Sequence, residues 1–464
     1  MRTGRFGIGR KGRDSPTPYH RGLVGRFGEA IAPGRMGRDF RWLLASSWTA
    51  QIGDGIALAA GPLLVASQTR NAVLVGLAAA LQRVPTLLFG LIAGAVADRH
   101  DRRRLVVAAN LARAVVLAVL ITTLGTGHVS IVIVLTAMFA LGCAEIFADT
   151  AFGTIMPMLV AKEDLGLGQA RLMAGFLTGN QLIGPPLGAF LVAAGMAWPF
   201  ATQVVTLLLG LLLILRIATR MHPRPDREPT HVRRDIADGV RWLLAHPPVR
   251  TLALVILIFN VTWGAAWSVL VLYSLDHLHM GEVGFGLLTT AAAVGGIAGT
   301  AAYGPLERHL PLAALMRACL TLEVATHFAL ALTTSGTVAI GIMVVFGAYA
   351  FVWGTLSSAV RQRAVPTELQ GRVSSVYLVC VIGGLVIGQL VGGVLAENWG
   401  LTAPFWFAGI GAGITLAIVW GQRPTSPTPT PAAEATHGAA MATGQNRSRP
   451  THDRTPPCQT STPG

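Results

Sequence analysis

Ionisable side chains interrupt several long apolar segments of the sequence, where each is costly unless it is paired or hydrated. Asp54 lies in the middle of one segment, and Glu145 and Asp149 share a helical face of another at positions i and i+4. Such carboxylates can bind and release protons, because burial favours the neutral form and a nearby cation, here Arg83 or Arg113, favours the charged form. We predict Glu145, Asp54 and Asp149 as proton-coupling residues. The alternatives are a structural ion pair or a helix-packing hydrogen bond for Asp54 and an interfacial position for Asp149.

Aromatic and amide side chains recur in four other apolar segments. Trp263 and Trp267 form one i, i+4 pair and Tyr349 and Trp353 form another, so each pair presents a single aromatic face. Aromatic faces with a few amides suit a bulky, flat, amphipathic small molecule, although aromatics also fill helix interfaces. The predicted substrate-cavity residues are Trp48, Gln51, Asn260, Trp263, Trp267, Tyr349 and Trp353.

The remaining reactive side chains form no catalytic or metal-binding pattern. Glu323 and His327 share a helical face and are predicted to pair with each other on a peripheral span, the alternative being a role as proton carriers. The four cysteines are scattered, without metal or disulfide spacing, and the chain contains no GxxxxGK[ST] loop for a nucleotide. We therefore expect no enzyme activity, no metal, no cofactor and no use of ATP.

The composition and the spacing of the apolar segments predict an all-α membrane protein. The 464 residues are 52% hydrophobic and 12% charged, with a mean hydropathy of +0.56, whereas soluble domains carry about 25% charged residues. The apolar runs are about twenty residues long, the length that a helix needs to cross a bilayer. We place twelve transmembrane spans at residues 42–66, 74–97, 105–124, 129–150, 173–195, 198–219, 251–275, 283–303, 313–333, 338–360, 373–395 and 402–421.

The net charge of +14 is distributed as a membrane topology signal. Arginines cluster before the first span and in the loops after even-numbered spans, whereas the loops after odd-numbered spans hold only Arg70. This positive-inside bias predicts a multi-pass protein of a bacterial inner membrane with both termini in the cytoplasm, and it argues against a nucleic-acid partner. We expect a monomer in the lipid bilayer.

An internal repeat relates the two halves of the chain by a constant offset of 209 residues. Arg41 maps onto Arg250, Asp98-Arg99-His100 onto Glu307-Arg308-His309, and Gly175 onto Gly384. Such repeats are typical of secondary transporters. The predicted organisation is a disordered basic N-terminus at 1–40, with Met36 as an alternative start, a six-helix bundle at 41–220, a cytoplasmic linker with an amphipathic helix at 221–250, a second bundle at 251–421 and a disordered tail at 422–464.

Two motifs resemble those of the major facilitator superfamily. The loop motif consists of Gly94, Asp98, Arg99, Asp101, Arg102 and Arg103, and the antiporter-like motif of Gly179, Gly184, Pro185 and Gly188. Further stretches, Gly53-Asp54 among them, resemble the exporter branch that includes enterobactin and macrolide efflux carriers. The resemblance covers about residues 40–421. It implies two pseudo-symmetric six-helix bundles, a latch from Asp98 to the span-eleven N-terminus near Arg372, and glycine stripes that pack spans five and eleven against spans eight and two.

The residues and the resemblance together predict an exporter. We expect a hydrophobic or amphipathic cargo, such as a drug, siderophore or natural product, to be expelled by alternating access in exchange for protons. The alternatives are an uncoupled facilitator or importer, and a transport-inactive receptor or assembly protein on the same scaffold.

The charge cluster between spans two and three gives a first testable prediction. Asp98→Asn should shift the balance between inward-open and outward-open states much further than Glu307→Gln, because the second copy of the loop has lost most of its charge. Labelling of cavity cysteines by impermeant maleimides from each side of the membrane measures this balance. Equal shifts in both variants would contradict the predicted latch.

Overall fold

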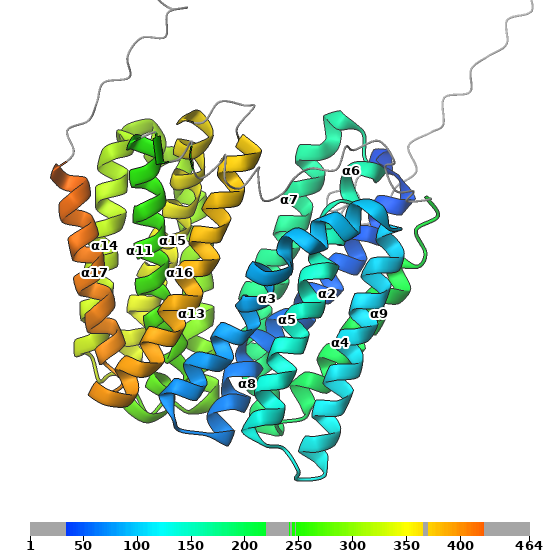
Figure 1. Ribbon diagram of the computed structural model, residues 1–464, viewed down its shortest axis with the longest axis horizontal. Coiled ribbons are helices and arrows are strands. Elements are labelled where there is room, and N and C mark those ends of the chain that lie inside the picture. The colour runs from blue at the N-terminus through cyan, green and yellow to red at the C-terminus, as the bar shows by residue number, and fades with distance from the viewer. Residues whose placement is uncertain (1–33, 220–240, 242–243, 246, 365–369, 422–464) are drawn as a thin grey trace, which may run out of the picture. The chain divides into compact units, whose positions relative to one another are not determined.

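The protein is helical throughout the part that the structure describes. The computed structural model describes residues 34–219, 241, 244–245, 247–364 and 370–421, and the regular elements in these ranges are helices (Figure 1). Each of the twelve predicted spans coincides with one of them or with a broken pair. The helices are α2 (Gly37–Gln68), α3 (Ala72–Arg99), α4 (Arg102–Gly125), α5 (Ile131–Gly153), α6 (Met156–Leu159), α7 (Leu165–Gly175), α8 (Gly184–Ala194), α9 (Trp198–Ile214), α11 (Pro247–Ser268), α12 (Leu270–Leu272), α13 (Gly281–His309), α14 (Leu312–Leu332), α15 (Gly336–Ala364), α16 (Gln370–Trp399) and α17 (Ala403–Gly421).

Most of these helices are long and apolar enough to cross a membrane. Among the described residues, eight satisfy both criteria, or nine if α11 and the bent segment after it count as one span. The apolar parts of α9 and α17 are shorter, at Trp198–Ile214 and Ala403–Ile418. Apolar side chains such as Val115, Phe190 and Leu332 are exposed around the outside, as expected for helices that face lipid.

Two spans are broken by π-helical segments. Residues Phe176–Ile183 form one between α7 and α8, and Tyr273–His277 form the other after α12. The second segment belongs to a piece, Leu270–His277, that is bent by 41° from the preceding helix. Because a π-turn takes up an extra residue, it changes which side chains face each neighbour, and such turns are frequent at functional sites.

Helix α2 begins earlier than the sequence predicted. We expected a disordered segment up to residue 40, but the helix starts at Gly37, after a 3₁₀ turn from Gly34 to Met36. The reason is burial: Phe40 is 0% exposed and, with Met36, joins an apolar cluster that includes Ile155. Outside the described residues lie positions 1–33 of the predicted N-terminal tail, the predicted tail at 422–464 and most of the predicted linker at 221–250 with its amphipathic helix.

The helices form two groups, α2–α9 and α11–α17, whose members pack mainly on one another. The two groups are joined through α3 with α16 and α8 with α13. We call the end with the loops after odd-numbered spans, which includes Thr69–Asn71 and Leu278–Met280, the odd-loop end. The opposite end, which includes His100–Asp101 and Leu310–Pro311, is the even-loop end.

The glycine stripes pack mainly inside each group, which corrects the expectation for span five, whereas Gly393 at the end of the span-eleven stripe meets Ala72 O of α3, as expected. The stripe of span five lies against α2, because a Cβ on Gly55 would be 2.6 Å from Asn180 O and 2.7 Å from Gly179 O. In the second group Gly264 of α11 lies against α16, with 2.7 Å to Leu385 O. Gly55 and Gly264 are related by the 209-residue offset, so the close helix contact is repeated in the second group together with the glycine. A different glycine, Gly286 of α13, is the one that approaches span five across the two groups.

The contact between α2 and span five gives a stability prediction. Gly55→Ala should destabilise the protein by about 1–3 kcal/mol, because the added methyl group overlaps backbone atoms that cannot move aside easily. Thermal unfolding of the purified protein in detergent measures the effect. Gly90→Ala is the matched control, since a Cβ on Gly90 meets no atom within 4 Å. Equal midpoints for the two variants would show that the contact is looser than described.

Candidate functional site

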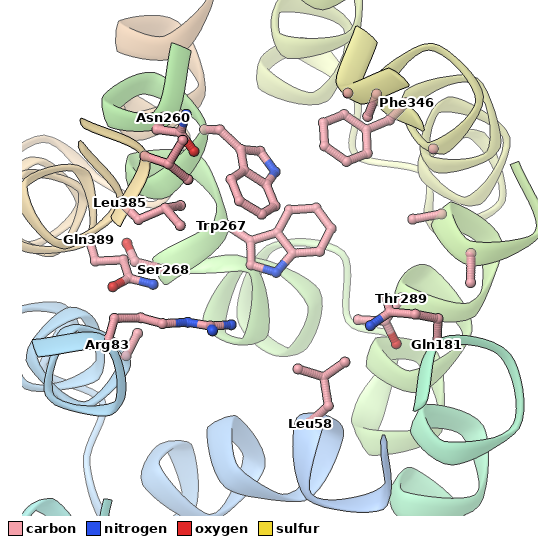
Figure 2. A pocket seen from close by; sticks show the side chains of 18 of the residues that line it. Leu58, Arg83, Gln181, Asn260, Trp267, Ser268, Thr289, Phe346, Leu385 and Gln389 are labelled. Atoms are coloured by element: carbon pink, nitrogen blue, oxygen red, sulfur yellow. The ribbon is translucent and has the colours of Figure 1, made fainter. Parts of the chain in front are cut away.

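A cavity of about 760 Å³ lies between the two helix groups. Its walls come from α2, α3, α5 and span five of the first group and from α11, α12, α13, α15 and α16 of the second group. Figure 2 shows Trp267, Arg83 and Gln181 projecting into this space from three different helices. A volume of this size suits a drug-sized molecule, since ligand pockets are about 300–1,000 Å³.

The structure brings four of the predicted substrate residues to the cavity and three elsewhere. Asn260, Trp263, Trp267 and Trp353 line it. The stacking of Trp267 on Phe346, at 5.3 Å between ring centroids, and of Trp353 on Phe259, at 5.7 Å, makes the wall largely aromatic.

The other three predicted residues have different partners. The indole of Trp48 donates a hydrogen bond to Arg171 O at 3.1 Å and packs on Gly175. Gln51 lies where α2 contacts Gly179 and does not line the cavity. Tyr349 is 3% exposed, and its hydroxyl is 2.9 Å from Thr326 Oγ1 on α14. The sequence placed these residues at the cavity because of their spacing from lining residues on the same helix or because of their position on α2. A neighbouring helix covers each of them, and the spacing alone could not reveal this.

Sequence reasoning missed a set of polar lining residues. Arg83 is the single charged residue among those that line the cavity, and it is exposed to that space. An isolated polar side chain inside an apolar span needs a polar environment, and this signal in the sequence could have identified the missed lining residues. These residues are Gln82, Arg83, Gln181, Ser268, Thr289 and Gln389.

Several buried polar atoms at the cavity are without a hydrogen-bond partner in the described part of the chain. They include the indole Nε1 of Trp263, the indole Nε1 of Trp353 and Oε1 of Gln389. Buried polar groups are normally satisfied, so unpaired ones at a cavity wall are available to a ligand.

Asp54 is held in an ion pair with a buried arginine, and its own side chain is half-buried. Arg113 of α4 contacts its Oδ1 with Nη2 at 2.5 Å, and Gln203 of α9 donates to the same oxygen at 3.4 Å. Arg113 is 5% exposed and Gln203 is 3% exposed. The pair and Gln203 come from three different helices. Because the guanidinium of Arg113 is buried, removal of the Asp54 carboxylate would leave a buried charge uncompensated.

Glu145 and Asp149 lie on α5 beside this pair. Both side chains are exposed in the structure, and both are within electrostatic reach of Arg113 and Arg83. The contact that positions them is Gly142, whose missing side chain lets α5 approach Gln82 O of α3. In the described ranges, no three His, Cys, Asp or Glu side chains are grouped as a metal site would require.

The loop motif between α3 and α4 forms a compact corner at the even-loop end. Asp101 is the N-cap of α4, and its carboxylate accepts a hydrogen bond from Arg104 N at 3.0 Å. Arg103 donates to the carbonyl oxygens of Ile217, at 2.9 Å, and Leu215 at the end of α9. These arginines therefore brace helix ends, in addition to their place in the charge asymmetry.

The first acidic residue of the same motif, Asp98, is paired within the corner. Asp98 Oδ1 lies 3.9 Å from Nη2 of Arg102, which is itself 5% exposed. Gly94 and Arg99 lie in the last turns of α3. Arg372 is in the first turn of α16, and its side chain is outside the described part, so the latch from Asp98 stays a prediction.

The antiporter-like motif spans the π-segment and the start of α8. Gly179, Gly184 and Gly188 face α2, where a Cβ on Gly188 would overlap Ile56 O. The opposite face of the same helix meets the second helix group, since a Cβ on Gly286 would be 3.3 Å from Pro185 O. The motif thus lies between α2 and α13.

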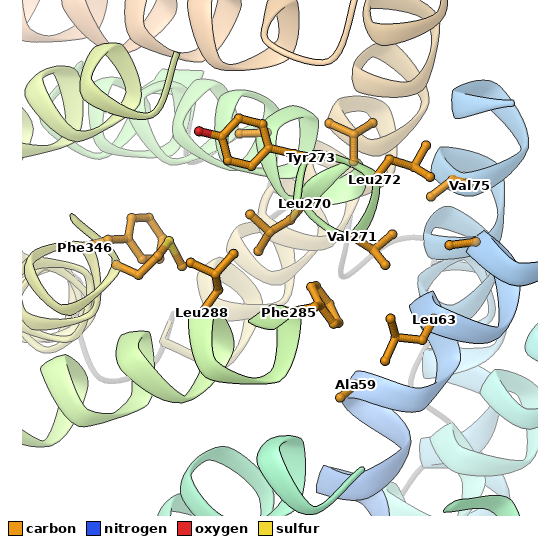
Figure 3. Packing of buried hydrophobic residues seen from close by; sticks show 14 of the residues in the cluster. Ala59, Leu63, Val75, Leu270, Val271, Leu272, Tyr273, Phe285, Leu288 and Phe346 are labelled. Carbon is orange, nitrogen blue, oxygen red and sulfur yellow. The ribbon is translucent and has the colours of Figure 1, made fainter. Parts of the chain in front are cut away.

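An apolar seal closes the cavity towards the odd-loop end. Leu63 and Val75 of the first group face Val271 and Phe285 of the second (Figure 3), and all four are at most 4% exposed. Val75, Val271 and Phe285 also line the cavity, so the seal is its floor.

Polar contacts join the two groups just beyond the seal. The carboxylate of Glu397 on α16 accepts hydrogen bonds from Ala72 N at 2.7 Å and from Asn71 Nδ2 at 3.2 Å, at the N-terminus of α3. Arg70 pairs with Asp276 at 3.0 Å. A carboxylate is well placed there because the free amides and the helix dipole favour an anion.

The chain matches known transport proteins along most of its length. The family model described as transmembrane secretion effector matches residues 29–439. The multidrug efflux pump Tap of Mycolicibacterium fortuitum is 28% identical over 381 residues, which are 78% of this chain and 90% of that protein. The enterobactin exporter EntS of Shigella boydii serotype 4 is 26% identical over 369 residues, covering 76% of this chain and 85% of that protein.

Solved structures show the same fold at low identity. A bacterial homologue of the iron transporter ferroportin, in an inward-facing state, has a TM-score of 0.68 and 16% identity, and the match covers 83% of this chain and 99% of that one. A bacterial homologue of the lysosomal transporter Spinster has a TM-score of 0.63 and 13% identity, with 84% and 98% covered. The predicted fold, all-α with two pseudo-symmetric bundles, is confirmed.

The contacts of Glu397 give the next prediction. Glu397→Gln should open the odd-loop end about five-fold more often, because it loses charge-assisted hydrogen bonds worth roughly 1 kcal/mol. The readout is maleimide labelling of Thr289→Cys in a background without native cysteines, from the odd-loop side. Glu282→Gln, an exposed acid at the start of α13, is the control. Unchanged labelling in Glu397→Gln would mean that the seal alone keeps this end closed.

Proposed function

The chain belongs to the major facilitator superfamily, in the family described as transmembrane secretion effectors, and we propose on this premise that it exports a hydrophobic or amphipathic small molecule across the bacterial inner membrane. The observation that carries the proposal is the 760 Å³ aromatic cavity between the two helix groups. The efflux activity named for Tap and EntS supports the outward direction.

The cavity wall supports a flat, amphipathic cargo. The indoles of Trp263 and Trp267 lie 5.5 Å apart at their centroids and offer faces for an aromatic or alicyclic body. The unpaired indole N–H groups of Trp263 and Trp353 can donate to acceptor atoms on the cargo. Arg83 adds a cation that suits a polar or acidic substituent.

Alternating access would move the bundles at 41–220 and 251–421 against each other. The seal and the Glu397 contacts hold them together at the odd-loop end, which the charge bias assigns to the outer face, with both termini cytoplasmic. With this orientation, the conformation described has its cavity closed towards the outer face of the membrane. Asp98 would meet the N-terminus of α16 near Arg372 when the even-loop end closes instead, and the antiporter-like motif would keep span five tight against proton leak.

Proton exchange would drive this cycle through the carboxylates beside the cavity. Glu145 is the best candidate, because it is exposed and close to Arg83, a residue that lines the cavity. Asp54 is already neutralised by Arg113, so its protonation would first have to break an ion pair. Asp149, one turn from Glu145, would share its charge environment.

Inverted membrane vesicles test the proposal directly. Addition of a hydrophobic dye from a panel such as ethidium, rhodamine 6G and Hoechst 33342 should cause dye uptake and proton release into the medium, measured with a pH-sensitive dye. Glu145→Gln should abolish the dye-driven proton release, because the amide cannot exchange a proton, whereas Glu282→Gln, outside the cavity, should behave as the wild type.

Asp54 needs a compensated variant. Asp54→Asn alone leaves Arg113 unpaired, a loss of about 3–5 kcal/mol for a buried pair, so it is compared with Asp54→Asn/Arg113→Gln. Dye uptake without proton release in the wild type would indicate an uncoupled facilitator. If the wild type gives neither dye uptake nor proton release with any dye of the panel, and the Glu145 and Asp54 variants behave in the same way, the result would support a transport-inactive receptor.

A further inference from the structure

A second pair of ionisable side chains is buried in the other helix group. Glu323 and His327 lie one turn apart on α14, at 0% and 2% exposure. The distance from His327 Nδ1 to Glu323 Oε1 is 3.5 Å, which confirms the predicted pairing. Nδ1 is closer to the backbone oxygen of Glu323, at 2.8 Å, so the imidazole N–H is directed mainly at the main chain.

The carboxylate has few other groups to stabilise it. Both of its oxygens are without a hydrogen bond in the described part of the chain. Tyr349 of α15 is close by, but its hydroxyl can donate to Thr326 Oγ1 at 2.9 Å, since Thr326 itself donates to Leu322 O at 2.8 Å. Cys319, one turn earlier on α14, is also buried and supplies no charge of opposite sign.

Other titratable groups contact a different part of α14. Tyr273 donates to Leu330 O at 2.6 Å, and His277 contacts Thr333 O at 3.1 Å, both at the end of the helix. The polar groups that the structure places next to the pair are therefore Tyr349, Thr326 and Cys319, and none of the three is a cation. A buried carboxylate with so few donors costs several kcal/mol as a bare anion, and the imidazole N–H is directed mainly at the main chain, so the proton stays on the carboxyl.

The pair lies one side chain away from the substrate cavity. The ring of Phe346 meets the His327 imidazole edge-on, at 6.5 Å between centroids, and stacks on Trp267 at 5.3 Å on its other side. Phe346 and Trp267 both line the cavity. A cargo that displaces Phe346 would give water a path to the pair, and hydration would allow the proton to leave.

We propose that Glu323 and His327 form a second proton-binding site, which releases its proton when the cavity wall at Phe346 moves. The inference rests on the proposed function, because the released proton is one of those exchanged for cargo. The site is specific to the second helix group, since the positions 209 residues earlier are Ala114 and Ala118.

Infrared difference spectroscopy on the purified full-length protein in lipid nanodiscs tests the site with the proton itself as the probe. Alkaline-minus-acid spectra of a Glu145→Gln/Asp149→Asn background, which removes the other carboxyls proposed to exchange protons, should contain the C=O band of a buried carboxylic acid. Glu323→Gln should lack this band but keep the thermal midpoint, because Gln has the shape of the protonated acid, while Glu282→Gln should keep both. An intact band in Glu323→Gln overturns the proposal, whether or not the thermal midpoint of the variant has changed.

A second variant covers the case in which Glu323→Gln does not fold. His327→Gln should keep the carboxyl band at a shifted frequency, because the neighbour of the acid has changed. An unshifted band overturns the proposal. In inverted vesicles the ratio of protons released to dye taken up should fall in Glu323→Gln, and an unchanged ratio also counts against it. Absence of dye-driven proton release in the wild type would instead refute the proposed proton exchange, whatever the spectra show.

Discussion

The arrangement of this protein depends on backbone carbonyl groups that lie directly against glycine Cα atoms of a neighbouring helix. In lipid, apolar side chains gain little by leaving their surroundings, so helices associate through close van der Waals contact between small residues. Gly295 and Gly299 of α13 contact Val344 and Ala348 of α15 in this way, and Gly347 of α15 contacts Ala292 in return. Because a Cβ at these positions would overlap backbone atoms, the crossings have one geometry, and they decide which face of each helix is left for the cavity.

The same contacts explain why the spans and the fold could be predicted from the sequence. Apolar runs of the right length identify a spanning helix whatever it packs against. The 209-residue offset catches the glycines because both groups use equivalent crossings, as at Gly55 and Gly264. A stripe of small residues states which face packs closely but not which helix is the partner. This is why span five was predicted to pack its stripe on α13, whereas it packs the stripe on α2 and meets α13 with Pro185 on the other face.

The cavity was less predictable for a related reason. Periodicity places Tyr349 and Trp353 on one helical face, yet Trp353 lines the cavity and the Tyr349 hydroxyl bonds to Thr326 on α14. That difference depends on a neighbouring helix, which no local pattern reveals. The π-segment at Phe176–Ile183 adds a second source of error, because it shifts the helical phase just where Gln181 enters the cavity. Irregular turns of this kind are fixed by packing rather than by propensity.

Charge is distributed over this symmetric scaffold in an asymmetric way. Asp54 forms an ion pair with Arg113, whereas the equivalent position 209 residues later is Trp263, an aromatic side chain of the cavity wall. Conversely, Glu323 has an alanine as its counterpart in the first group. The glycine contacts allow this, because close backbone packing at the helix crossings does not depend on which other positions of a helix are ionisable. Each half can therefore differ in its polar positions. The ionisable residues add their own contacts, as Asp54 does by joining α2 to α4 and α9, and since each carries a cost of burial, a position in the spans that keeps one needs a partner to compensate it.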